Sequence, residues 1–215
     1  MIVLAVNELN VDYIKRYISE GKLPGFKKLF ANGLIKTVSE KKYELLEPWI
    51  QWTTVQTGKS FNDHKVFRLG DIVDRPDLMQ IFEDLEERGL SVGAISPFNA
   101  DNRLKEPDFF IPDPWTQTKA SGGFLIEKTS QTVSRFVNSN ASGKVGLLDV
   151  FWLLLGFLAL VRVKRWPKFF KFIVQRKKPG VKAAILDSIL LEIFVTLQRR
   201  HRPDYSHLFF NGVAH

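Results

Sequence analysis

Two short apolar runs, residues 2–6 and 206–210, are each followed directly by polar side chains. Asn7 and Glu8 follow the first run, and Asn211 follows the second. Apolar runs of this length with polar flanks are typical of buried strands. In an open parallel sheet the carboxyl ends of the strands form the edge at which ligand sites are built. The pattern therefore predicts that Asn7 and Asn211 lie together at one edge of a sheet.

Between these two runs the chain alternates between strand-like and helix-like patterns. Apolar runs predict further strands over 34–38 and 91–96. Apolar positions at helical spacing predict helices over 11–20, 26–31, 49–57 and 77–88. This order predicts the α/β fold class, with a parallel sheet flanked by helices. The segment 97–122, rich in Pro, Asp, Asn and Phe, is expected to be an ordered irregular loop.

The chain changes character after this loop, because helical periodicity then dominates until the last strand. Helices are expected over 124–138, 145–175 and 181–200, and Pro167 is expected to break or kink the middle one. These helices lie between two predicted strands and therefore read as an insertion. We divide the chain into an α/β core (1–122), a helical basic insertion or cap (123–202) and a return strand of the core (203–215).

Positive charge is concentrated in the insertion. The net charge is +8, and residues 151–200 hold eleven Lys and Arg against Asp187 and Glu192, which is +9, so the rest of the chain sums to −1. No recognised nucleic-acid-binding motif accompanies this charge, so we expect no nucleic-acid partner. The chain has no cysteine, which excludes disulfides, thiolate zinc sites and cysteine nucleophiles.

The insertion contains a nineteen-residue, largely apolar segment, 145–163, whose charged residues are Asp149 and Arg162, followed by the basic aromatic stretch 164–171. Three interpretations stay open: helices that bury one another and carry a solvated basic face, contact of 145–178 with a membrane surface, or a membrane span. The first apolar run is too short for a signal peptide. We expect a cytoplasmic protein, with membrane association as the alternative.

The most specific pattern lies at 47–67, which reads EPWIQWTTVQTGKSFNDHKVF, and a second lies at 20–29, which reads EGKLPGFKKL. The first resembles the nucleophile region of the alkaline phosphatase superfamily, and most of all its type I phosphodiesterase/nucleotide pyrophosphatase branch. Trp52, Thr57 with Gly58, and His64 fall on that family's pattern. The second resembles the family's Glu-Gly-x-Leu-Pro segment. The resemblance covers 2–96 and returns at 204–215, so we expect the N-terminal part of a longer protein.

The resemblance implies an alkaline-phosphatase-like fold and a divalent-metal-dependent hydrolase or transferase of phosphate esters, diphosphates or sulfates. Its cofactor would be zinc or manganese, which polarises the ester and stabilises developing charge. Its substrate would be a phosphorylated or sulfated small molecule or glycan. The metal ligands implied in this chain are Asn7, Glu8, Asn211 and His215.

Two of these positions depart from the family pattern, because Asn7 and Asn211 stand where the family has metal-binding aspartates. Asn is neutral, so the loss of two carboxylates weakens a two-metal site unless Glu8 and Glu47 replace them. The nucleophile position holds Pro48, which has no nucleophilic group. The adjacent Glu47 is therefore the candidate catalytic residue.

Lys59 and Arg68 are the candidate substrate-binding residues, since either could hold a phosphate or sulfate near the implied site. Each candidate also has a structural interpretation: Asn7 bonding a neighbouring loop, Glu8 and the two cations solvated, Glu47 in a turn, and His64 pinning the loop after Gly58.

Two functions therefore stay open: the altered metal-dependent hydrolase, or a catalytically inactive relative that binds an anionic ligand or a membrane surface. We expect the 215-residue chain alone to be inactive and to expose apolar surface around 208–210.

Overall fold

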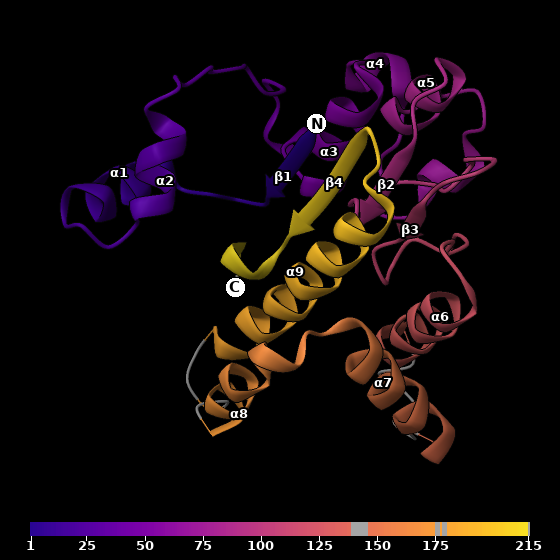
Figure 1. The fold of residues 1–215 in the computed structure, drawn as a ribbon. Coiled ribbons are helices and arrows are strands. Elements are labelled where there is room, and N and C mark those ends of the chain that lie inside the picture. The colour runs from indigo at the N-terminus through magenta and orange to yellow at the C-terminus, as the bar shows by residue number, and fades with distance from the viewer. Residues whose placement is uncertain (139–145, 175–176, 178–179, 215) are drawn as a thin grey trace.

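The computed structural model describes residues 1–138, 146–174, 177 and 180–214. Within them, four strands form one sheet (Figure 1): β1 (Ile2–Val6), β2 (Val92–Ile95), β3 (Phe109–Ile111) and β4 (Tyr205–Phe210). Their order is β1-β4-β2-β3, and every neighbouring pair is parallel. The last strand along the chain is therefore central in the sheet. The predicted α/β class, with a parallel sheet flanked by helices, is confirmed.

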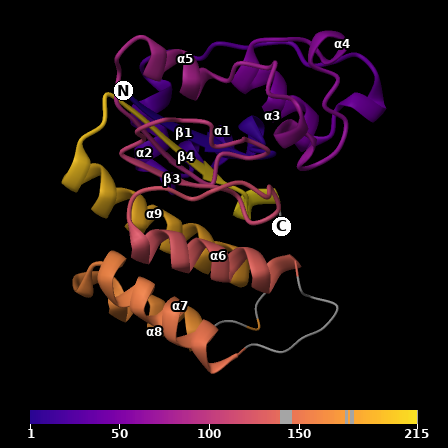
Figure 2. The ribbon, with the colours of Figure 1, turned by 90° about the vertical axis from the view of Figure 1, so that its right-hand side faces the viewer.

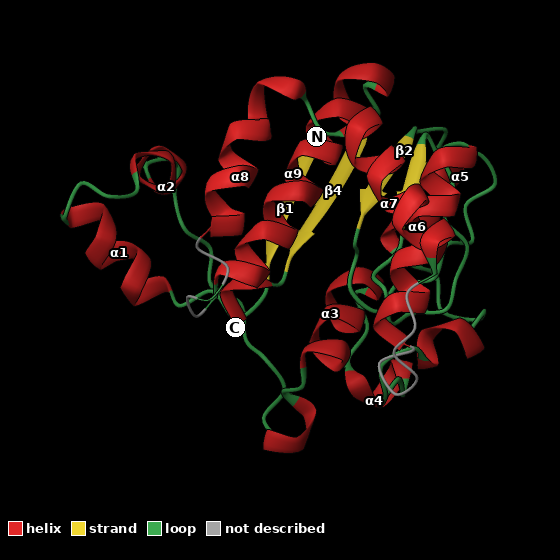
Figure 3. Cartoon of the chain, turned by 90° about the horizontal axis from the view of Figure 1, so that it is seen from below, coloured by secondary structure: helices red, strands yellow, loops and turns green. Residues whose placement is uncertain are grey.

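Helices cover both faces of this sheet (Figure 2). One face carries α3 (Pro48–Thr57), α4 (Phe61–His64) and α5 (Ile81–Glu87). The opposite face carries α6 (Phe124–Asn138) and α9 (Val181–His201), and α7 (Leu147–Leu160) and α8 (Trp166–Val174) form an outer layer beyond them. The helices α1 (Val11–Ser19) and α2 (Pro24–Phe30) stand to one side, away from the sheet (Figure 3). Short 3-10 turns span Tyr43–Leu45, Asp71–Asp74, Val163–Arg165 and Gly212–Ala214.

The alternation of side chains along β4 builds a core on each face of the sheet. Tyr205 packs with Phe82 of α5 in one apolar cluster, on the α3–α5 side. Leu208 packs with Ile193 and Leu197 of α9 in another, on the opposite side. A central strand that is covered on both faces reads as a nearly continuous apolar run, which is why the sequence pattern located it.

Two predictions about the sheet were wrong. Residues 34–38 form no strand, and Ile35 and Val38 are 92% and 97% exposed, because no neighbouring strand pairs with this run among the described residues. Conversely, β3 lies inside the segment 97–122 that was expected to be irregular. Its three residues are too few to show a period, and pairing with β2 decides their conformation.

The long helix predicted over 145–175 is two helices separated by a turn. The chain leaves α7 at Val161, and Pro167 lies in the first turn of α8 rather than at the break. A proline there costs no intrahelical hydrogen bond, because the first N–H groups of a helix have no partner within it. The helix predicted over 124–138 has those bounds in the structure.

The exposed apolar surface of the sheet is not where we expected it. Leu208 and Phe209 are buried, because α9 covers one face of β4 and α3 lies against the other. The exposed residues of the sheet are Ile2 and Leu4 on the edge strand β1. In the parallel register Leu4 lies beside Leu208, so the two side chains share one face of the sheet. The helix α9 covers that face at β4 but leaves Leu4 of β1 exposed.

Candidate functional site

An asparagine or aspartate follows the carboxyl end of each strand in the described sheet. Asn7 follows β1, Asn211 follows β4, Asn99 lies after β2 and Asp113 lies after β3. The parallel pairing of the strands brings these four segments to one edge of the sheet. Sequence analysis predicted the first two members of this polar edge and missed the other two.

Asn7 and Asn211 are in direct contact, as the sequence pattern predicted. Asn7 Nδ2 donates to Asn211 Oδ1 at 2.9 Å, and Asn7 Oδ1 accepts from Trp52 Nε1 at 3.0 Å. The Asn7 backbone N–H donates to the Phe210 carbonyl at 2.9 Å, which extends the ladder between β1 and β4 by one bond. The side chain of Asn7 thus ties β1 to the end of β4 and to α3.

The residues after β4 are held by the helix that covers the sheet. The backbone N–H groups of Asn211 and Gly212 donate to the two carboxylate oxygens of Asp187 on α9, at 3.3 Å and 2.9 Å. A Cβ added at Gly212 would lie 2.4 Å from Asp187 Oδ2, so only glycine allows this approach. Asp187 therefore fixes the strand end from which Asn211 contacts Asn7.

The second half of the polar edge is buried. Asn99, in the left-handed backbone region with φ of 52°, accepts from Gly70 N at 2.8 Å and donates from Nδ2 to Trp49 O at 2.9 Å and Thr53 Oγ1 at 3.1 Å. Asp113 accepts four hydrogen bonds: one from Asn99 N, and three from Trp115 and Thr116. Burial raises the pKa of the Asp113 carboxyl, and these hydrogen bonds, which favour the charged form, oppose that shift.

The acidic candidates lie at the surface. Glu8 is exposed and adopts a left-handed backbone with φ of 53°, immediately after Asn7. Glu47 is exposed at the start of α3 and makes no capping hydrogen bond with its side chain, while Pro48 occupies the first turn. Across the described residues, no three His, Asp or Glu side chains are grouped to hold a metal ion. The predicted ligand His215 lies outside the described residues.

The two asparagines alone do not fit a two-metal site. Both side-chain oxygens already accept an N–H, from Trp52 and from Asn7, and neither group carries charge. Several anionic ligands are needed to hold two divalent ions near one phosphoryl group. The catalytic role of Glu47 and the metal roles of Asn7, Glu8 and Asn211 stay predictions.

His64 is buried and holds a loop. Its Nδ1 accepts from the Val66 backbone N–H at 3.0 Å, so the proton lies on Nε2, which is 3.1 Å from Thr54 Oγ1. Arg75 also donates to the His64 carbonyl. Burial lowers the pKa of the ring, which keeps it neutral.

Lys59 and Arg68 are exposed, and their substrate-binding role stays a prediction.

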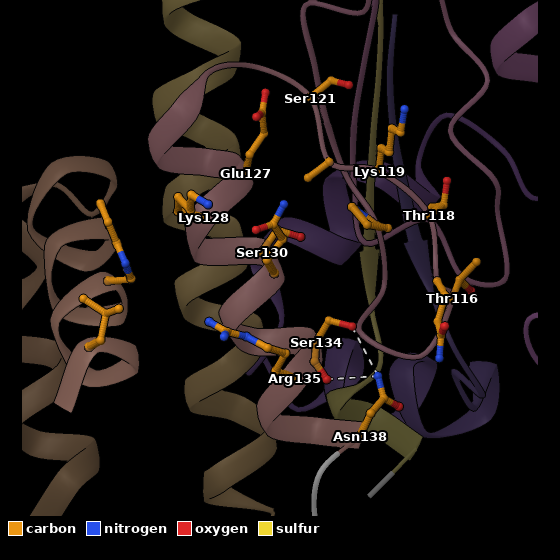
Figure 4. A pocket seen from close by; sticks show the side chains of 16 residues that line it. Thr116, Thr118, Lys119, Ser121, Glu127, Lys128, Ser130, Ser134, Arg135 and Asn138 are labelled. Carbon is orange, nitrogen blue, oxygen red and sulfur yellow. Dashed lines mark hydrogen bonds between the residues drawn. The ribbon is translucent and has the colours of Figure 1, made fainter. Parts of the chain in front are cut away.

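A cavity of about 980 Å³ lies between α6 and the loop 112–121 that follows β3 (Figure 4). We call it the α6 pocket. Leu148 and Trp152 of α7 also line it. Its polar residues come from a loop that the sequence pattern marked only as irregular and from one face of α6. Neither segment carries a motif, so sequence analysis missed it.

The outer layer carries the largest exposed apolar group of the described helices. We define the α7 apolar face as the exposed large apolar residues of α7: Leu147, Leu148, Val150, Phe151, Leu154, Leu155 and Leu158. The neighbouring α8 basic segment consists of four exposed cations, Lys164 and Arg165 in the 3-10 turn that precedes α8 and Lys168 and Lys171 in α8 itself. In the part of the chain described here, no helix combines the length and hydropathy needed to cross a bilayer.

The α8 basic segment is anchored to α9 by a buried carboxylate. Glu192 is 6% exposed and pairs with Arg162 Nε at 2.7 Å and Arg165 Nε at 3.4 Å.

Comparison of this chain with family models, with curated proteins and with solved structures finds no match.

Proposed function

We propose that this protein binds an anionic membrane surface through the α7 apolar face and the α8 basic segment. The observation that carries the proposal is the exposure of α7: Leu147 is 92% exposed and Leu154 is 56% exposed, on a helix whose apolar side chains would otherwise be buried. Large apolar patches are uncommon on soluble monomers and mark interaction surfaces.

The exposed positions on α7 recur at helical spacing, so they form one side of the helix. Leu147, Phe151, Leu154 and Leu158 are three or four residues apart. The opposite side packs inward, where the buried Gly156 lies against Thr129 of α6. A helix with this division inserts its apolar side chains shallowly at the boundary between headgroups and acyl chains.

The positive charge beside the α7 apolar face favours an anionic lipid surface, and not another apolar protein surface, as its partner. The α8 basic segment follows α7 in the same outer layer (Figure 2), and its four cations are exposed. Each Lys or Arg near an anionic bilayer contributes about 1 kcal/mol. Exposed Phe170 lies among them and adds an aromatic side chain suited to the headgroup region.

Sedimentation with vesicles tests the proposal. The full chain is mixed with vesicles of phosphatidylcholine alone or with added phosphatidylserine, at low and high salt. We expect binding to the anionic vesicles that weakens with salt, because screening reduces the attraction of exposed charges. Charge reversal at Lys164, Lys168 and Lys171 should abolish it. These lysines are chosen over Arg165, which pairs with Glu192.

Two controls separate lipid binding from general effects of charge and folding. Charge reversal of the exposed Lys15, Lys27 and Lys28 on α1 and α2 should leave binding unchanged. Replacing Leu147 and Leu154 by Ser should weaken binding without lowering the melting temperature. Vesicle binding that changes neither with salt concentration nor with charge reversal of the α8 basic segment would contradict the proposal. A dimer that forms without lipid and is disrupted by the Leu-to-Ser variant would also contradict it.

The metal-dependent hydrolase remains a second candidate, because Asn7 and Asn211, two of the ligand positions that the resemblance implies, meet at the sheet edge beside Glu8. Its test is a zinc and manganese titration of the full chain and of Glu8→Gln. Stoichiometric binding that the variant loses would support a site completed by Glu8. Equal weak binding by both proteins would reject it. Lys164, Lys168 and Lys171 play no part in this measurement, so the two candidates are tested separately.

A further inference from the structure

The α6 pocket lies on the side of α6 that faces the loop after β3, and it shares Leu148 with the α7 apolar face. Figure 4 shows Glu127 and Lys128 projecting from α6 on one side and Thr118 and Lys119 from the loop on the other. The loop is fastened to the end of α6: Ser134 Oγ donates to Pro114 O at 3.0 Å, and Asn138 Nδ2 donates to the same carbonyl at 2.8 Å. The two walls of the pocket are therefore held in place.

Two cations of this pocket have no carboxylate partner among the described residues. Lys119 and Lys128 form no ion pair with any described residue, and the Lys128 ammonium lies 5.6 Å from the centroid of the Phe124 ring. The third cation, Arg135, is engaged with Asp149 at 2.7 Å. A pocket with unpaired ammonium groups on both walls attracts an anion, and a phosphate or sulfate group accepts hydrogen bonds from several donors at once.

The remaining lining points to a ligand richer in hydroxyl groups than a bare anion. Glu127, Ser130 and Gln131 line the pocket from α6, and their side chains have no hydrogen bond to any described residue. These groups accept from and donate to hydroxyls. The volume of about 980 Å³ is also at the upper end of the range for small-molecule pockets, and one phosphate would leave most of it unfilled.

We propose that the α6 pocket binds a phosphate or sulfate ester of a polyhydroxy compound. Lys119 and Lys128 hold the anionic group, and Glu127, Ser130 and Gln131 form hydrogen bonds with the hydroxyls. The ester can be a free small molecule or a lipid headgroup. Leu148 belongs both to the pocket lining and to the α7 apolar face, so the pocket lies beside the proposed lipid-binding surface. Binding of a free ester does not depend on that surface.

Titration calorimetry of the full chain with glucose 6-phosphate, glucose 6-sulfate, glucose and inorganic phosphate tests this proposal. We expect the two esters to bind more tightly than glucose or phosphate alone. Lys119→Gln combined with Lys128→Gln should weaken ester binding by about tenfold or more, since charge-assisted hydrogen bonds are lost. Lys15→Gln combined with Lys27→Gln changes charge by the same amount outside the pocket and should have no effect.

Further variants separate recognition of the anion from recognition of the hydroxyls. Glu127→Gln keeps the shape of the side chain and removes its charge, so ester binding should be preserved or strengthened. Gln131→Ala should weaken the esters and leave inorganic phosphate unaffected. Equal melting temperatures of the variants establish that they are folded. Ester binding that survives the double lysine change, equal affinity for phosphate and the esters, or no ester binding by the folded chain would overturn the proposal.

Vesicles distinguish the two sources of the ligand. Phosphatidylinositol 4-phosphate is compared with phosphatidylserine at matched surface charge. A headgroup ligand predicts preference for the phosphoinositide that the double lysine change removes, while charge reversal on α8 weakens binding to both lipids. A free ester predicts no preference, with glucose 6-phosphate still bound. Loss of all vesicle binding with ester binding intact would reject the lipid surface and leave the pocket proposal supported.

Discussion

The side-chain amide of Asn7 donates a hydrogen bond of 2.9 Å to the side-chain oxygen of Asn211, although 204 residues separate them in the chain. The contact joins the carboxyl ends of the first and last strands, which are neighbours in the sheet. It also occupies the two positions at which the resemblance to the alkaline phosphatase superfamily implies carboxylate ligands. An amide pair needs no metal to hold it together, whereas two carboxylates at this distance would repel one another.

Replacing Asn7 by Leu should lower the free energy of unfolding by about 1–3 kcal/mol, because Trp52 Nε1 and Asn211 Oδ1 each lose the hydrogen bond to Asn7. Asn7→Asp should also destabilise the chain, since a carboxylate keeps the acceptor for Trp52 but loses the donor to Asn211. Urea unfolding measures both effects. Asn62→Ala, at an exposed asparagine on α4, is the control and should unfold like the parent chain. An unchanged unfolding midpoint for Asn7→Leu would contradict the structural role.

Gly156 sets the distance between α7 and α6. A Cβ at this position would lie 2.5 Å from Thr129 Oγ1 and 2.8 Å from Thr129 Cγ2. Gly156→Ala should therefore lower the melting temperature, despite the better helix propensity of Ala. Gly25→Ala in α2, where a Cβ meets nothing within 4 Å, should be neutral or stabilising. Adding Thr129→Ala to Gly156→Ala should restore part of the lost melting temperature. If it does not, the close approach to Thr129 is not the cause of the loss.

His207 should make the protein less stable as the pH falls. The ring is buried on β4 against Phe82, and burial lowers its pKa from 6.5 to about 4. Between these values the unfolded chain binds a proton that the folded chain excludes, so stability present above pH 6.5 is lost as the pH falls toward about 4. A shift of this size corresponds to about 3 kcal/mol.

Urea unfolding across this pH range, on the parent chain and on His207→Asn, measures that contribution. The variant should show a shallower dependence on pH. Some dependence should persist, since burial also lowers the pKa of His64. Asp113, whose raised pKa acts in the opposite direction, is present in both proteins and cancels in the comparison. If the free energy of unfolding depends on pH equally in His207→Asn and in the parent chain, His207 is not the source of that dependence.

Much of the fold was predictable because its strongest signals are local. The apolar run 206–210 is covered on both faces and was located from its composition, and α6 was predicted with its observed bounds. The run 34–38 has a similar composition but is no strand, since a strand needs a neighbour. The strand β3 shows the reverse case: three residues without periodicity become a strand through pairing with β2.

The candidate site was predictable only in part, for a related reason. The parallel arrangement brings strand ends together, so the meeting of Asn7 and Asn211 followed from the strand order. Asn99 lies several residues beyond β2 and Asp113 lies two residues beyond β3, in a segment without regular spacing. Their hydrogen-bond partners come from α3 and from turns. Hydrogen bonds made by irregular backbone cannot be derived from a pattern.

The sequence by itself determined the α/β class, the strand ends that meet and the concentration of charge between residues 151 and 200, because periodicity and composition are properties of neighbouring residues. The tertiary structure alone decided which apolar residues stay exposed. The composition of 145–163 left three interpretations open, and in the structure α7 packs inward only through the side that holds Gly156 and Leu160. It likewise decided that Lys119 and Lys128 face one cavity, because a loop and a helix meet there only after the sheet has formed.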